Sequence, residues 1–161
     1  IQYNGNIAMV QASINMKDIP MSKCLLLTNK DIYDNETKFV FGMSEINGNI
    51  SLISTYHFSS EDPSSFLRLL KILTHEFSHT LGLEHCVSNK CVIGGIFSIE
   101  ELDSHPLFPC MEDCAKIAFA CGRSLKDQLC SFIRACDKIN ISNIIQEEYN
   151  HMLEAINLLT E

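Results

Sequence analysis

The segment from His75 to His85 places three histidines and one glutamate in the pattern His-Glu-x-x-His-x-x-Gly-x-x-His. An α-helix turns through about 100° per residue, so His75 and His79 lie one turn apart on one helical face, with Glu76 beside them. Gly82 predicts the end of this helix, since glycine readily adopts the left-handed conformation of a C-terminal cap. A sharp turn there brings His85 back towards the other histidines. The pattern therefore predicts a helix and a turn that gather three imidazoles.

Three imidazoles and a nearby carboxylate are typical of a catalytic zinc site. Neutral histidines bind zinc at about 2.0–2.1 Å, and three of them leave a fourth position open for water. Zinc lowers the pKa of that water towards about 7. Glu76 can then accept its proton and deliver it to the leaving amine of a cleaved peptide bond. We therefore predict that His75, His79 and His85 bind the catalytic zinc and that Glu76 is catalytic.

The residues before the histidines predict a helix over about 63–81. Asp62 and Pro63 are typical of a helix start, with aspartate as the cap and proline at the first helical position. Mostly apolar residues then recur at intervals of three and four positions, which indicates one helical face. They are Phe66, Leu69, Leu70, Leu73, Phe77, Thr80 and Leu81. We expect this face to pack into the core, with His75 and His79 roughly opposite it.

The chain has eight cysteines, and four of them form two close pairs. Cys86 and Cys91 follow the last histidine, and Cys110 and Cys114 come after a loop. Two such pairs predict a structural zinc site with four thiolate ligands. The even number of cysteines leaves disulfides as the alternative. We interpret the remaining four cysteines as small buried apolar residues.

Together these residues resemble the archaemetzincins, a family of zinc-dependent metallopeptidases. The family signature joins the three-histidine motif to Cys-x4-Cys-x-Met and, after a spacer, to Cys-x2-Cys. The chain matches it from His75 to Cys91, and the similarity extends over about residues 1–118. Ile93 stands at the methionine position, where its side chain is expected to fill the same space. The later pair is Cys110-x3-Cys114, one residue longer than in the family, and the chain begins at Ile1, as a trimmed or divergent short form would.

The resemblance implies two zinc ions, one catalytic and one structural, and an extended substrate along an edge strand. We expect residues 38–44 to be that strand. The substrates it suggests are short peptides or the N-termini of proteins. The alternative function is a catalytically inactive zinc-binding module that acts as a protein-interaction domain. The intact Glu76 favours the enzyme, because a purely structural site has no use for a base beside an open metal position.

Composition limits the partners of the chain. Its 161 residues are 46% hydrophobic, enough for one domain with a sizeable core. Twelve lysines and arginines against 20 acidic residues give a net charge of −8, which argues against nucleic-acid binding. No stretch reaches the roughly 18 apolar residues of a membrane span. Metal-bound thiolates favour a reducing compartment, so we expect a cytoplasmic or nuclear protein. We also expect a monomer.

The sequence predicts an α/β fold with a mixed twisted sheet and packed helices, zincin- or metzincin-like, and a helical C-terminal part. A helix is expected over residues 6–17, and a buried strand over 23–28. Strands 38–44 and 49–55 are expected to form a hairpin around Asn47 and Gly48. Further helices are expected at 112–121, 124–138 and 141–159. We divide the chain into a catalytic domain, residues 1–121 with the structural zinc site, and a helical extension, residues 122–161, packed on the same domain.

Overall fold

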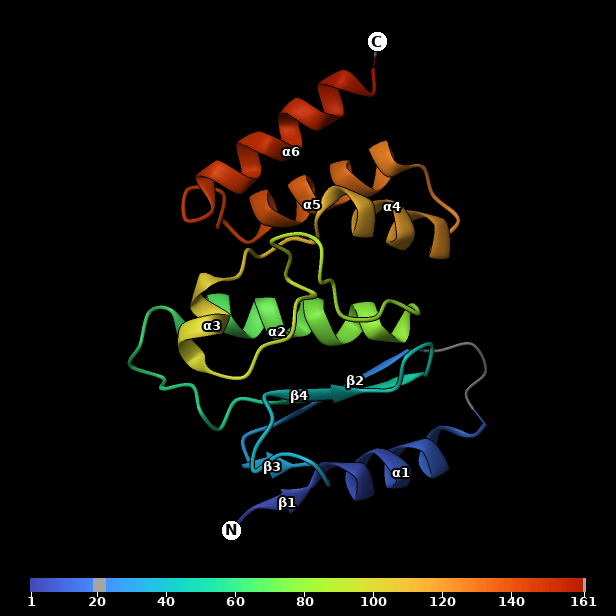
Figure 1. Ribbon diagram of the computed structural model, residues 1–161, viewed down its shortest axis with the longest axis vertical. Coiled ribbons are helices and arrows are strands. Elements are labelled where there is room, and N and C mark those ends of the chain that lie inside the picture. The colour runs from blue at the N-terminus through green and yellow to red at the C-terminus, as the bar shows by residue number, and fades with distance from the viewer. Residues whose placement is uncertain (19–22, 161) are drawn as a thin grey trace.

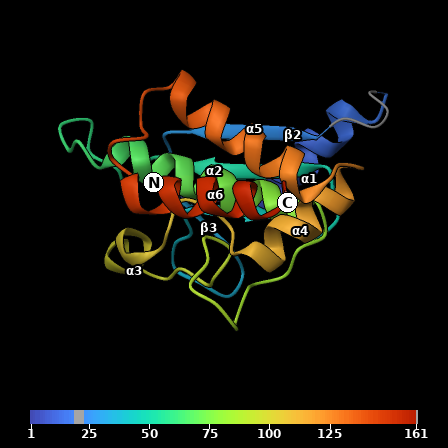
Figure 2. The ribbon, with the colours of Figure 1, turned by 90° about the horizontal axis from the view of Figure 1, so that it is seen from above.

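The computed structural model describes residues 1–18 and 23–160, whose elements are stacked in layers (Figure 1). Helix α1 (Gly5–Met16) lies at one end of the stack, below the main sheet, and α2 (Ser65–Thr80) lies above that sheet beside α3 (Ile99–Ser104). Above α2 come α4 (Met111–Ala120) and α5 (Leu125–Lys138), and then α6 (Gln146–Leu158). The predicted mixture of a small sheet and packed helices is confirmed. Viewed from above, α6 lies over α2, and α3 lies to one side (Figure 2).

The main sheet has three strands in the order β2-β5-β4. Strand β5 (Ile50–Ser54) is central, parallel to β2 (Cys24–Thr28) and antiparallel to β4 (Gly42–Ser44). The predicted hairpin is confirmed, and Asn47 adopts a positive φ of 58° in its turn. A second, two-stranded sheet pairs β1 (Tyr3–Asn4) with β3 (Ile32–Tyr33) in parallel. These two short strands and α3 were not predicted, because segments of two to six residues carry no clear periodicity.

The predicted strand 38–44 is wrong in its first half, since β4 begins only at Gly42. Before β4, Phe41 packs into the core with Ile53 and Ile72, and Phe39 packs against it. The apolar residues before Gly42 therefore belong to a loop that packs into the core, and their pattern resembles that of a strand. Similarly, the last helix begins at Gln146 and not at 141, because Asn140 takes a φ of 57° and a turn follows it.

Helix α2 is covered on more than one side, which corrects the expected division into one core face and one histidine face. Leu67 and Leu70 pack against the cluster built by α5 and α6, whereas Ile72 packs against the sheet. Phe66 and Phe77, expected in the core, are 51% and 36% exposed. His75 and His79 are buried as well, and their rings contact the Val92 and Leu83 carbonyls in the segment that follows α2. Periodicity predicts one apolar face and does not reveal a second buried face made of polar residues.

Separate apolar clusters hold the layers together. Strand β5 is buried on both faces, with Leu52 packing towards Met9 of α1 and Ile53 packing towards α2. The largest cluster joins the C-terminal helices to the loop before α4; it comprises Leu107, Phe108, Cys114, Leu129, Ile133, Cys136, Ile141, Ile145 and Met152. Within the described residues, no helix combines the length and the apolar character that a membrane crossing requires.

Candidate metal centre

Gly82 ends α2 as predicted, with a φ of 93° that L-residues rarely adopt. Its N–H and that of Leu83 donate back to the carbonyls of His79 and Ser78, at 2.9 and 3.3 Å. The Lys23 ammonium donates to the Thr80 carbonyl at 2.7 Å, so a positive charge lies at the negative end of the helix dipole. The chain therefore reverses directly after the second histidine, and His85 joins the other two.

The ring nitrogens of His75, His79 and His85 lie within 4.8 Å of one another. The Nδ1 of His75 lies 2.8 Å from the Val92 carbonyl, and that of His79 lies 2.7 Å from the Leu83 carbonyl. A carbonyl oxygen only accepts hydrogen bonds, so both Nδ1 atoms carry the proton and both Nε2 atoms of the neutral rings present a lone pair.

These two Nε2 atoms face each other at 3.0 Å. Burial keeps the rings neutral, because it lowers the pKa of His75 to about 4 and also lowers that of His79. Two facing lone pairs without a proton between them repel, and a cation bound by both removes that repulsion. Neutral imidazoles with their Nδ1–H held by carbonyls are the form that ligates zinc. The three histidines therefore fit a zinc ion.

Glu76 lies beside the histidines and is only 5% exposed. The Ser44 hydroxyl donates to its Oε2 at 2.7 Å, which joins the glutamate to strand β4. Gly42 lies against the same carboxylate: a Cβ there would be 2.5 Å from Oε1. Burial raises the pKa of Glu76 to about 7, against the opposing effect of the Ser44 hydrogen bond. This carboxyl therefore exchanges a proton near neutral pH in the metal-free protein.

A cleft of about 780 Å³ opens over these residues. Its floor includes the three histidines and Glu76, and residues 36–44 form much of its wall. In the described residues β4 pairs only with β5, so its other edge is free of strand partners. The acidic side chains of Asp34, Glu36 and Glu84 line the cleft, against the single cation of Lys38.

Ile93, which replaces the methionine of the family signature, is fully buried. It packs with Leu83, Val92 and Ile117. Two of these neighbours supply the carbonyls that hold His79 and His75. The isoleucine therefore fills a core position beside the residues that hold the His75 and His79 rings.

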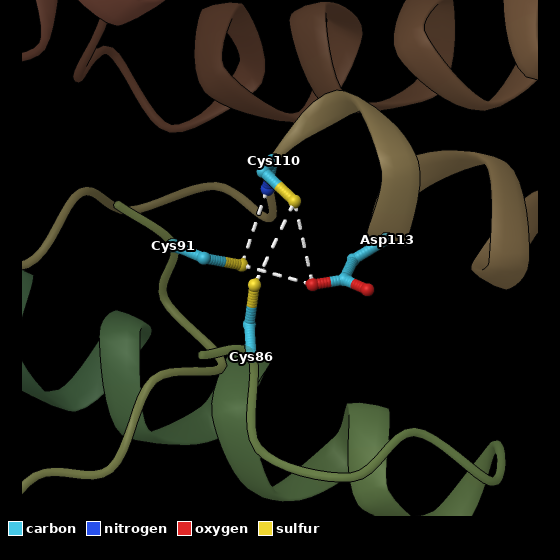
Figure 3. A group of neighbouring side chains, drawn as sticks. All are labelled: Cys86, Cys91, Cys110 and Asp113. Atoms are coloured by element: carbon cyan, nitrogen blue, oxygen red, sulfur yellow. Dashed lines mark hydrogen bonds between the residues drawn. The ribbon is translucent and has the colours of Figure 1, made fainter. Parts of the chain in front are cut away.

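The structure brings three of the four predicted cysteine ligands together and leaves the fourth apart. Cys86, Cys91 and Cys110 converge with Asp113, and their ligand atoms all lie within 4.8 Å of one another (Figure 3). All eight cysteines, each within the described part of the chain, are free thiols. The expectation that Cys114 joins this group is corrected.

Cys114 fails to reach the group because of its place on α4. Cys110 is the N-cap of the helix, so Asp113 lies one turn along on the side of Cys110, and Cys114 points about 100° further round. The Cys114 thiol instead donates to the Pro109 carbonyl at 3.3 Å and packs in the C-terminal cluster. The signal in the sequence was the spacing Cys110-x2-Asp113, which keeps the two-residue gap of the family pair. Sequence reasoning also missed Ser44 and Gly42, the neighbours of Glu76.

The sequence model of Peptidase family M54 matches residues 7–118 of this chain. The chain belongs to this family. Archaemetzincin from Archaeoglobus fulgidus is 33% identical over 119 residues, which cover 73% of this chain and 74% of that protein. The crystal structure of archaemetzincin from Methanopyrus kandleri matches with a TM-score of 0.59 and 31% identity, covering 63% of this chain and 57% of that one.

The crystal structure of Archaeoglobus fulgidus archaemetzincin complexed with malonate matches with a TM-score of 0.58 and 33% identity, over 71% of this chain and 69% of that one. The matches thus span from 57% to 74% of the length of these relatives. The resemblance to the archaemetzincins is confirmed. The chain therefore belongs to a family of zinc metallopeptidases.

Proposed function

We propose that this protein is a zinc-dependent peptidase with its active centre at His75, His79, His85 and Glu76. The observation that carries the proposal is the pair of unprotonated Nε2 atoms at 3.0 Å on the floor of a cleft, next to a buried carboxylate. Membership of Peptidase family M54 supports it. Two histidines lie on a helix that packs against the sheet, and the third follows a glycine turn; this arrangement supports a metzincin-like fold.

The three histidines would hold one zinc ion. Bound there, zinc supplies a Lewis acid that polarises the scissile carbonyl and acidifies the attacking water. The Val92 and Leu83 carbonyls orient two of the rings and fix the tautomer that ligates.

Glu76 is the proton carrier of the proposed reaction. A cation beside it favours the carboxylate form, which opposes the effect of burial on its pKa. The carboxylate accepts the proton of the attacking water and then donates it to the leaving amine. Ser44 holds Oε2, and Gly42 leaves the space that the carboxylate needs.

A peptide substrate would lie extended along β4. The free edge of this strand offers main-chain hydrogen bonds, and the cleft beside it receives alternate side chains. The excess of acidic over basic side chains along the cleft attracts a protonated amine. These features support short peptides or protein N-termini as substrates.

In this proposal, the chain divides into two parts at residue 121. We propose that residues 1–121 form the catalytic part and that residues 122–161 form an extension packed on it. The contacts of Leu67 and Leu70 with the C-terminal cluster support this arrangement. The free thiols support a reducing compartment, cytoplasm or nucleus.

The proposal is tested with the zinc-loaded protein, its Glu76→Gln variant and a mixed peptide library. Glu147→Gln is the matched control, because Glu147 is exposed and does not line the cleft. We expect cleavage by the wild type and the control, and a loss of at least about 100-fold in Glu76→Gln with zinc retained. If the wild type holds zinc at the histidines and cleaves nothing, the protein is an inactive zinc-binding module that serves as an interaction domain.

A further inference from the structure

A second group of ligand atoms lies outside the cleft, between the loop after α2 and the start of α4 (Figure 3). Cys86 and Cys91 come from the loop, and Cys110 and Asp113 come from the first turn of the helix. The sulfurs of Cys86 and Cys110 are 3.9 Å apart. The Oδ2 of Asp113 lies 3.3 Å from the Cys91 sulfur and 3.4 Å from the Cys110 sulfur. Three sulfurs and one carboxylate oxygen thus face a common centre.

One oxygen of the buried Asp113 carboxylate, Oδ2, faces the three sulfurs. Asp113 is only 3% exposed, and Oδ2 has thiols, which are weak donors, as its partners. Its other oxygen, Oδ1, accepts from the Lys116 ammonium at 2.8 Å. Lys116 therefore fixes the orientation of the carboxylate and leaves Oδ2 aimed at the sulfurs. Oδ2 has only thiols as partners, and a divalent cation would give it a strong one.

Cys114 lies apart from the three sulfurs, with its thiol on the Pro109 carbonyl. Its side chain is 1% exposed and lies in the cluster that joins the C-terminal helices to the loop. Cys114 lies about 100° further round α4 than Asp113, so its sulfur faces this cluster. The position that faces the three sulfurs is therefore occupied by aspartate in this chain.

We propose that the chain binds a structural zinc ion through the thiolates of Cys86, Cys91 and Cys110 and the Oδ2 of Asp113, with Lys116 as a positioning residue. Binding displaces the protons of the three thiols, while the carboxylate is already ionised. Three thiolates and a carboxylate carry the same total charge as four thiolates. The oxygen makes the site harder, so it disfavours soft ions such as Cd²⁺ relative to an all-sulfur site. None of these ligands lies in the cleft, so the proposed zinc site can be tested independently of the proposed peptidase activity.

The first test replaces zinc with Co²⁺ in the full chain, because thiolate-to-cobalt absorption in the near ultraviolet grows with the number of Co–S bonds. Asp113→Cys adds a fourth sulfur at the proposed ligand position. We expect it to keep the metal and to raise this absorption by about one third, the ratio of four thiolates to three. Unchanged absorption in metal-bound Asp113→Cys would overturn the assignment of Asp113.

The second test compares Asp113→Ala with the matched variant Cys114→Ala, and circular dichroism checks that both are folded. We expect Cys114→Ala to keep the wild-type zinc content and cobalt spectrum, and Asp113→Ala to bind this zinc at least about 10-fold more weakly. The opposite pattern would restore Cys114 as the ligand. Purified protein with a Cys86–Cys110 disulfide and no metal at this site would overturn the proposal altogether.

Discussion

Replacing Gly42 with alanine probes the contact between strand β4 and the Glu76 carboxylate. The added Cβ would lie 2.5 Å from Oε1, 2.6 Å from Cγ and 2.7 Å from Cδ of Glu76. Such distances are well below van der Waals contact, so the glutamate or the strand has to move. The φ of Gly42 is not positive, so alanine itself causes no backbone strain. Any effect of the substitution therefore arises from the clash between the added Cβ and the Glu76 side chain.

Overpacking of this kind costs about 1–3 kcal/mol of stability. For a chain of this length, each 1 kcal/mol lowers Tm by about 2–4 °C. A carboxylate displaced by about 1 Å should also lower kcat by about 100-fold. The histidines are not touched, so zinc binding at this centre should persist. Urea unfolding and peptide cleavage measure the two effects.

A double-mutant cycle with Glu76→Ala separates this explanation from a general effect on the strand. With the glutamate side chain removed, the alanine at position 42 meets no carboxylate, so its cost should fall to within about 0.5 kcal/mol. Ser44 remains satisfied in that background, because its hydroxyl also contacts the Ser51 hydroxyl and the Glu76 carbonyl. Equal costs of Gly42→Ala in both backgrounds would refute the reasoning.

Three further predictions concern stability. In the metal-free protein the pKa of Glu76 is raised from 4.5 to about 7. The contribution of this carboxyl group to folding stability is therefore fully present below pH 4.5 and is lost as the pH rises through 7. Between these values wild-type unfolding free energy should fall by up to about 3 kcal/mol relative to Glu76→Gln, measured by urea unfolding; parallel curves would contradict this. Gly82→Ala should cost about 1–2 kcal/mol in thermal unfolding and weaken zinc binding, because φ is 93° there; unchanged zinc affinity would count against the role of the turn. Glu148 accepts from the Leu107 and Phe108 N–H groups, so Glu148→Ala should cost about 1.5–3 kcal/mol, whereas exposed Glu147→Ala should cost little.

The sequence was sufficient for the features that depend on local spacing. The intervals between His75, Glu76, His79 and Gly82 determine a helical face and its end, and both are as predicted. The turn at Asn47 likewise follows from residues that tolerate positive φ. In each case a short stretch of chain determines the geometry, so no distant contact is needed to predict it.

The sequence-based predictions were wrong where the position of a side chain depends on tertiary contacts or on a shift of one residue along a helix. Whether Asp113 or Cys114 faces the sulfurs depends on Cys110 being the N-cap of α4. Phe66 is exposed and His75 is buried. The His75 ring lies against the Val92 carbonyl, 17 residues further along the chain, and no local pattern indicates that contact. Ser44 reaches Glu76 from a strand 32 residues away in sequence, and no local pattern indicates that contact.

Stepwise return of zinc to the metal-free protein tests the central claim most directly. Peptide cleavage and zinc binding are followed together, in the wild type and in His79→Ala. We predict that cleavage rises in step with the zinc bound by His75, His79 and His85, and that His79→Ala neither gains this ion nor cleaves. Cleavage by His79→Ala at the wild-type rate, or no cleavage by wild type with these histidines filled, would contradict the account.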